Sequence, residues 1–190
     1  MRRVVPSEFG FHLEDPTDFV LGGKIKLRDT LINSGLEYTF IFTSGFYEFL
    51  FGPITGFNVK EGKLTIAGDG NQPFSTTHTS DVAKFVPEVL LDPSSKNRKV
   101  HIYGEVTTYN QAIKIFEEEL GRKFEVTYQS ETDLQKIVEN QENPFVDRIF
   151  AHIKKLLIFT NQAYDSADHQ RYSKAVTPKT IREFAQSFKQ

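Results

Sequence analysis

The side chains that could carry chemistry in this chain are five histidines and one lysine at the start of a predicted helix. The histidines are His12, His78, His101, His152 and His169. None belongs to an HxH or HExxH pair, and no carboxylate spacing completes a metal site. His78 lies three residues before Asp81, but the chain has no GxSxG serine, so a hydrolase triad is not indicated. We therefore predict no metal site, and we interpret each histidine as a surface or core-edge residue.

Lys24 opens a predicted helix directly behind Gly22 and Gly23. The positive end of a helix macrodipole disfavours a protonated amine there, which suits a lysine that gives and takes a proton. Lys26 and Arg28 follow on the same helix. The alternative interpretation of the three positive charges is therefore a solvated basic helix face.

The amino-acid composition argues against several classes of function. The 190 residues carry 23 Lys and Arg against 25 Asp and Glu, a formal net charge of −2, so electrostatic binding of nucleic acid is not indicated. The absence of cysteine excludes disulfides, thiolate metal sites and cysteine nucleophiles. The N-terminal MRRVVPSEFG lacks the apolar region of a signal peptide, and the apolar stretch 38–57 is broken by Gly45, Glu48 and Pro53. We expect a soluble, cytoplasmic protein with no membrane span.

The elements that must position these side chains follow an α/β rhythm. We predict a short strand over 3–5, a turn over 6–10, a helix over 23–34 with Leu27 and Leu31 on its apolar side, and a buried strand over 36–42. Further strands are expected over 63–67, 74–77, 99–103 and 124–128, and further helices over 81–91, 108–120, 131–139, 144–159 and 178–189. Thr177 and Pro178 would form the N-cap and first residue of the last helix.

Gly68-Asp69-Gly70 lies between two predicted strands and invites comparison with a dinucleotide fingerprint. The third glycine of that fingerprint is replaced by Pro73, and no helix is predicted to open behind it. We therefore interpret the segment as a hairpin turn that joins the strands over 63–67 and 74–77.

A family resemblance begins at RRVVPSEFG, residues 2–10. This segment is similar to the (K/R)RF(I/V)PSEFG segment of the NmrA-like and isoflavone-reductase-like group of atypical short-chain dehydrogenases/reductases. The similarity continues through KIKLRDTLINSGLEYTFIFTSGFYEF, GDG, TSDVAKFV and NQAIKIFEEELGRK, which together span nearly the whole chain.

The resemblance implies an α/β fold that is part of an NAD(P)-binding Rossmann-like fold, with its N-terminal strands missing. Residues 1–60 would be the remnant of the Rossmann sheet, and residues 61–190 a mostly helical substrate region. By the same resemblance Lys24 is the catalytic general acid/base, and the substrate is a small molecule. The residues implied at the NADP cofactor are Pro6, Ser7 and Phe9, and those implied at the substrate pocket are Phe46 and Tyr47.

The chain departs from the family pattern at its start, because its 190 residues contain no glycine-rich strand–turn–helix for the cofactor pyrophosphate. We expect the chain to be a C-terminal portion of the family pattern, with on the order of 100 residues of βαβ units missing. Such a portion is expected to bind NADPH poorly on its own. Three functions remain open: an NAD(P)H-dependent oxidoreductase, a non-catalytic dinucleotide-sensing regulator that acts through protein partners, and an inactive fragment. A protein partner or a homo-oligomer is compatible with all three.

Overall fold

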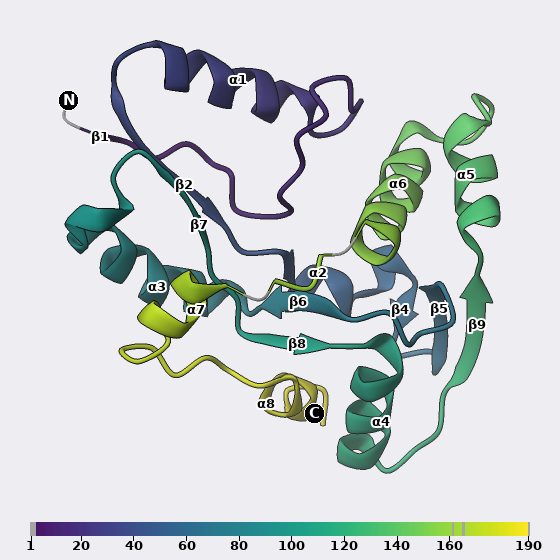
Figure 1. Ribbon diagram of the computed structural model, residues 1–190. Helices are drawn as coiled ribbons and strands as arrows, with labels where there is room; N and C mark the ends of the chain where they lie inside the picture. The colour runs from purple at the N-terminus through teal and green to yellow at the C-terminus, as the bar shows by residue number, and fades with distance from the viewer. Residues whose placement is uncertain (1–2, 161, 165, 190) are drawn as a thin grey trace.

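The computed structural model describes residues 3–160, 162–164 and 166–189, which form a mixed α/β fold (Figure 1). The strands are β1 (Arg3–Val4), β2 (Glu37–Phe42), β3 (Gly45–Phe46), β4 (Phe57–Asn58), β5 (Lys63–Ala67), β6 (Phe74–Thr77), β7 (Arg98–His101), β8 (Glu105–Thr107) and β9 (Glu125–Gln129). Within the described ranges they form three sheets, ordered β1-β2-β7, β3-β6-β8 and β4-β5-β9. The predicted fold class, a partial Rossmann-like α/β fold, is confirmed.

The helices surround these sheets. They are α1 (Gly22–Asn33), α2 (Tyr47–Leu50), α3 (Thr79–Leu91), α4 (Tyr109–Leu120), α5 (Glu131–Glu139), α6 (Phe145–Phe159), α7 (Ala167–Tyr172) and α8 (Ile181–Gln186), with short 3-10 turns η1 (Pro53–Thr55) and η2 (Pro93–Ser95). Among the described residues no helix combines the length and the apolarity that crossing a bilayer requires.

β2 is the middle strand of the first sheet, and it pairs in parallel with both neighbours. Ile41 packs on one face with Phe85 of α3 and Tyr172 of α7. The next residue, Phe42, points to the opposite face, where the guanidinium of Arg28 in α1 lies 5.3 Å from its ring centroid. Helices therefore cover both faces of the strand (Figure 1), which explains why its sequence is apolar without alternation.

α1 forms where a helix was predicted, but it buries a different side. Ile25 and Arg28, three residues apart, are buried, whereas Leu27 is 48% exposed. The predicted apolar side was therefore wrong for Leu27, whereas Leu31 is half-buried. The physical reason is the ion pairing of Arg28, described below, which turns its side of the helix toward the protein interior.

The turn at Gly68 and Gly70 does not close a hairpin. Both glycines have left-handed backbone, with φ of +70° and +80°, as a tight turn requires. The two flanking strands nevertheless enter different sheets, because β5 pairs with β4 and β9 while β6 pairs with β3 and β8. The carbonyl of Gly70 accepts a hydrogen bond from Asn110 N at the start of α4. The loop is thus anchored on a distant helix, and the hairpin prediction was wrong.

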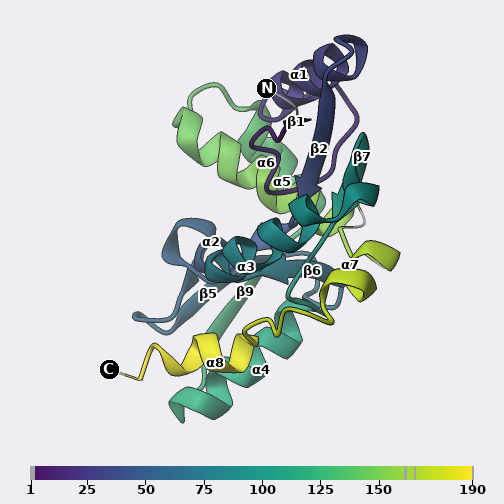
Figure 2. The same cartoon turned by 90° about the vertical axis from the view of Figure 1, so that its left-hand side faces the viewer.

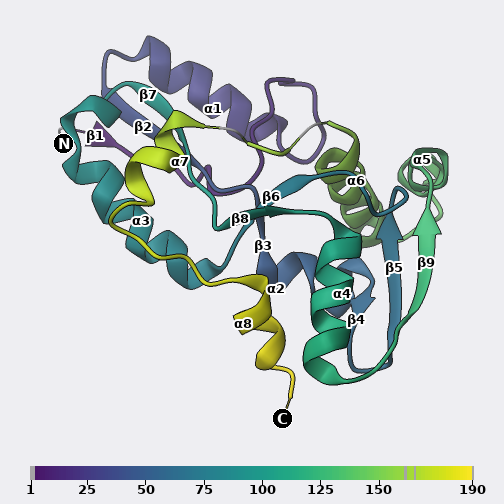
Figure 3. The ribbon, with the colours of Figure 1, turned by 60° about the horizontal axis from the view of Figure 1, so that its bottom comes forward.

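The C-terminal half packs two helix pairs around β5 and β9. α5 lies beside α6, and α4 lies beside α8 (Figures 1 and 3). α4 begins with the predicted Thr108 cap, completed by Gln111 in a capping box, and ends at left-handed Gly121. α8 starts later than predicted, because Thr180 and Glu183 form its capping box in place of Thr177 and Pro178. The short helix α7 was not predicted.

The parallel sheet does not end at residue 60. β7, residues 98–101, is the strand next to β2, and α3 before it covers one face of the same sheet. Figure 2 shows β2 and β7 side by side in the upper part of the view, and Figure 3 shows β5 and β9 toward the right, away from them. The sheet therefore takes strands from both predicted segments, 1–60 and 61–190.

We expect Phe116→Ala to lower the free energy of unfolding by about 3–5 kcal/mol, since the side chain is fully buried and a cavity would remain. Its ring lies 5.6 Å from that of Phe51 and 5.1 Å from that of Phe57. Phe145→Ala, at a residue 63% exposed, is the matched control and should change stability by less than about 0.5 kcal/mol. Urea denaturation measures both, and similar losses in the two variants would contradict this core assignment.

Candidate functional site

The carboxyl ends of the parallel strands meet at one edge of the first sheet. β2 ends at Phe42 and β7 at His101, which are register partners, and β1 leads into the loop 5–21. The carbonyl of Gly10 in this loop accepts hydrogen bonds from Thr43 N (3.2 Å) and Ser44 N (2.9 Å). The loop is thereby fixed across the end of β2, at the edge where open α/β sheets bind ligands.

Backbone strain marks the same edge. Ser44 is buried and has φ of +56°, a left-handed conformation that a non-glycine residue rarely adopts. Such strain persists where the surroundings hold the chain, and it is concentrated at functional sites. Here the hydrogen bond from Ser44 N to Gly10 O supplies the restraint.

The turn over residues 6–10 presents one side to solvent and one to the interior. Glu8 N donates to Pro6 O at 2.8 Å. Ser7 is exposed, Pro6 and Phe9 are half-buried, and Glu8 is buried. The three residues predicted at the cofactor therefore lie together on one turn at this edge of the sheet.

Arg28 ties this turn to α1. Its Nε lies 3.7 Å from Glu8 Oε1 and its Nη1 lies 3.6 Å from Glu14 Oε2, and its Nη2 donates to Leu13 O. Burial raises the pKa of Glu8, and the positive charges of Arg28 and Lys24 oppose that rise. Because Nε and Nη1 make no hydrogen bond in the described structure, charge attraction is what compensates their burial.

Lys24 lies on the side of α1 that faces the turn. It is half-buried, and its positive charge is one of those that lower the pKa of Glu8. Lys26 is exposed, as expected for a residue about 200° further around the helix. Lys24 therefore shares the face of α1 that Arg28, four residues later, turns toward Glu8.

A histidine pair that was not predicted completes this edge. His101 Nε2 lies 2.8 Å from His12 Nδ1, and His12 Nε2 lies 2.7 Å from Glu14 Oε1. Because the Glu14 carboxylate accepts from Nε2–H of His12, Nδ1 is left to accept from His101. Burial and the neighbouring His12 lower the pKa of His101 to about 4. Burial also lowers the pKa of His12, so both rings are neutral at pH 7.

Tyr164 covers the histidine pair from the segment between α6 and α7. Its ring packs edge-on against His101, and its hydroxyl accepts from His12 N at 2.9 Å and donates to Gln162 Oε1 at 2.9 Å. The sequence offered one signal for this cluster. His12 follows the turn over 6–10, and His101 lies in the strand predicted over 99–103. The two histidines share one sheet edge because β2 and β7 are adjacent and parallel, which the sequence pattern does not specify.

The two residues predicted at the substrate pocket lie at different depths. Phe46 in β3 is half-buried. Tyr47 is fully buried, and its hydroxyl donates to Glu105 Oε1 at 2.7 Å and is 3.0 Å from Lys179 O. Burial and the Glu105 carboxylate raise the pKa of the Tyr47 hydroxyl. Tyr47 is therefore part of the buried core.

No group of three or more His, Cys, Asp or Glu that could hold a metal ion is present in the described part of the chain.

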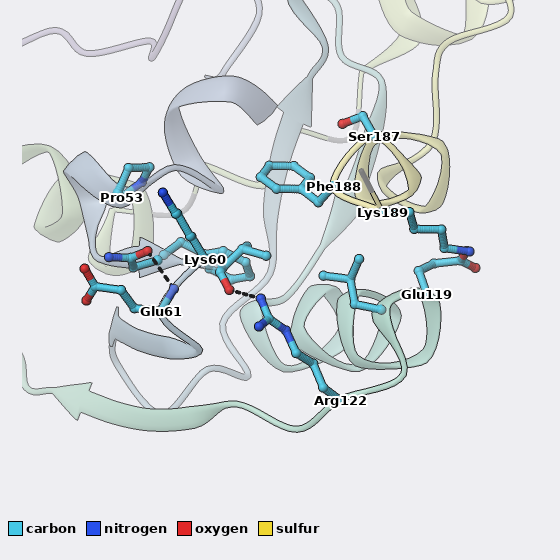
Figure 4. A pocket seen from close by; sticks show the side chains of 12 residues that line it. Pro53, Lys60, Glu61, Glu119, Arg122, Ser187, Phe188 and Lys189 are labelled. Carbon is cyan, nitrogen blue, oxygen red and sulfur yellow. Dashed lines mark hydrogen bonds and ion pairs between the residues drawn. The ribbon is translucent and has the colours of Figure 1, made fainter.

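A groove of about 910 Å³ lies away from this edge, between residues 57–61 and the ends of α4 and α8 (Figure 4). Arg122 donates to Val59 O, and Lys189 Nζ pairs with Glu119 Oε2 at 2.8 Å. Both cations are thus bound by residues that line the groove themselves. We assign the groove no part in the chemistry of the sheet edge.

Comparison with known proteins gives consistent relationships. The NmrA-like family model matches residues 1–185. The isoflavone reductase homolog A622 of Nicotiana glauca is 28% identical over 154 residues, which cover 76% of this chain and 50% of the relative. The crystal structure of isoflavone reductase superposes with a TM-score of 0.84 at 24% identity, covering 98% of this chain and 66% of that one. The leucoanthocyanidin reductase–NADPH complex of Vitis vinifera gives 0.82 at 21% identity, with 98% and 65% covered. The chain thus spans about half the length of its curated relatives.

We expect Arg28→Met to destabilise the protein at pH 7 by about 3–5 kcal/mol, because the buried carboxylate of Glu8 would lose its guanidinium partner. Removing that charge would raise the pKa of Glu8 further above its usual range. A group whose pKa is raised by folding stabilises the fold when protonated, so the loss should shrink as the pH falls from 7 to 5.

Urea denaturation at both pH values measures this effect. Lys26→Met, on the exposed side of the same helix, is the control and should change stability by less than about 0.5 kcal/mol. Glu8→Gln combined with Arg28→Met should recover part of the loss. A loss that is independent of pH and of the residue at position 8 would show that the ion pair is not what holds the turn.

Proposed function

Since the chain belongs to the NmrA-like family, we propose that it forms the nicotinamide-facing and substrate-binding part of an NAD(P)H-dependent reductase of a small organic compound. The observation that best supports this proposal is that Lys24 lies one helical turn before Arg28, which contacts the loop at the carboxyl edge of the parallel sheet, and that the charge of Lys24 lowers the pKa of Glu8 in the turn over residues 6–10. The names of its relatives, isoflavone reductase homologs and an NADPH-bound reductase, support it.

Each residue then has a defined task. Pro6, Ser7 and Phe9 contact the nicotinamide end of the dinucleotide, and Phe46 lines the substrate pocket. Tyr47, the next residue, is buried in the core. When bound, the dinucleotide supplies the hydride. The Lys24 ammonium gives the accompanying proton to the substrate, or takes it in the reverse direction. The neutral His12 and His101 pair closes the edge without adding positive charge beside that lysine.

The cofactor fits the described residues in part. The turn over 6–10, with its exposed Ser7, suits the nicotinamide end. The 190 residues contain no GxGxxG segment to supply backbone N–H groups to the pyrophosphate. We therefore propose that a complete active site needs a glycine-rich nucleotide-binding segment in addition to these residues. A regulator that binds the dinucleotide without turnover remains the alternative, and the Lys24 experiment separates the two.

We expect Lys24→Ala to abolish turnover while retaining NADPH binding, in a version of the protein that carries a glycine-rich segment ahead of these residues. A lost general acid/base lowers the rate by about 10²–10⁴-fold. Lys26→Ala is the control and should change the rate by less than about threefold, because its side chain points away from the edge. Steady-state kinetics and NADPH fluorescence measure the two effects. Equal losses in both variants, or full activity in Lys24→Ala, would remove Lys24 from the mechanism and favour the regulator.

The isolated 190-residue chain should bind NADPH poorly or not at all, because most of the affinity for a dinucleotide comes from its pyrophosphate cradle. Titration of the purified chain with NADPH, followed by nucleotide fluorescence, tests this expectation. Micromolar binding would show that residues outside the glycine-rich fingerprint hold the pyrophosphate.

A further inference from the structure

Lys154 is a buried lysine on α6 that the proposed reductase chemistry does not use. Its side chain is 8% exposed, and its Nζ donates to Thr65 O of β5 at 3.1 Å and to Gln129 Oε1 of β9 at 2.6 Å. Both acceptors are neutral. An ammonium group has three N–H donors, so these two contacts leave one donor for another acceptor.

The charge of Lys154 has no carboxylate partner. No ion pair to it is found within 4.0 Å in the described ranges, and burial is the cause that lowers its pKa, to about 8. Asp147, the other charged residue beside the same cavity, lies seven residues earlier on α6, two helical turns away. A buried cation without a counter-charge is costly to the fold, and a bound anion would offset that cost.

Lys154 lines a cavity of about 400 Å³, as do Thr65 and Gln129, the two residues that its Nζ contacts. This volume lies within the size range of small-molecule sites. The apolar part of the wall comes from η1, α5 and α6, through Ile54, Leu134, Ile137, Phe150 and Ala151. The cavity therefore offers one positive group and an apolar surface with an aromatic ring, a combination that fits a compact apolar acid.

This cavity is separate from the sheet edge that holds Lys24. His152, two residues before Lys154, pairs with Asp18 of the loop 5–21, with His152 Nε2 2.6 Å from Asp18 Oδ2. Two residues along a helix are about 200° apart. α6 thus presents His152 to the candidate active-site loop and Lys154 to the cavity on its other side.

We propose that this cavity is a binding site for a small aromatic monocarboxylate, with the Lys154 ammonium as the counter-charge of the carboxylate. A monoanion is favoured over a phosphate, because a single lysine supplies the positive charge and Asp147 adds a negative one. The ring of the ligand would pack against Phe150 and Leu134. The site goes beyond the proposed reductase and requires no dinucleotide.

Benzoate and its neutral analogue benzamide test the site in the 190-residue chain by calorimetry and thermal denaturation. We expect benzoate to bind, to raise the Tm, and to bind at least about tenfold more tightly than benzamide, the equivalent of one charge-assisted hydrogen bond. Lys154→Met should abolish the preference for benzoate. Lys155→Met is the matched control: Lys155 pairs with Gln135 and Glu131 on the neighbouring helix, and its removal should leave benzoate binding unchanged.

A second measurement keeps the test decisive if Lys154→Met does not fold. Raising the pH of the unmodified chain from 7 to 9.5 deprotonates Lys154 but leaves benzoate ionised, so the affinity should fall at least about tenfold. Three outcomes would each overturn the proposal. These are equal binding of benzoate and benzamide, no binding of either ligand at about 10 mM, and an affinity for benzoate that does not change with pH. Benzoate binding that survives Lys154→Met would overturn it as well.

Discussion

The candidate site depends on one buried ion pair between Arg28 and Glu8. The loop 5–21 carries Pro6, Ser7, Phe9 and His12 but has no helix or strand of its own. Arg28 contacts this loop through Glu8, Glu14 and the carbonyl of Leu13. A charged pair in the interior stabilises only when its geometry is kept, because either partner left alone is a desolvated charge. The pair therefore holds loop and helix in one relative position, and Lys24 with them.

Burial also sets the charge state of the sheet edge. It raises the pKa of Glu8 and lowers that of His101, since the charged form of each is penalised away from water. The histidines stay neutral and bridge to Glu14, which in turn pairs with Lys99 of β7. The positive charges that remain at the edge belong to arginine and lysine side chains. Such charges would suit a site that orients an anionic cofactor and moves one proton.

α6 connects the two sites proposed here. Its His152 contacts the loop 5–21 through Asp18, and its Lys154 contacts β5 and β9. The helix therefore contacts both the loop of the candidate active site and the sheet beside the cavity. The same helix packs beside α5 (Figure 1).

Local sequence determined much of this protein. The cap residues Thr108 and Gly121 identified α4, and the mostly apolar run over 36–42 identified β2, because caps and buried strands are marked by neighbouring residues. The PSEFG segment and the segment that begins at Lys24 carried the family resemblance. Tertiary structure decided the rest. β5 and β6, on either side of the Gly68 turn, belong to different sheets. The ion pairs of Arg28 determine which side of α1 is buried. Parallel pairing of β2 with β7 places His101 beside His12. Each of these outcomes rests on contacts between residues far apart in the chain, whose energies no local pattern records.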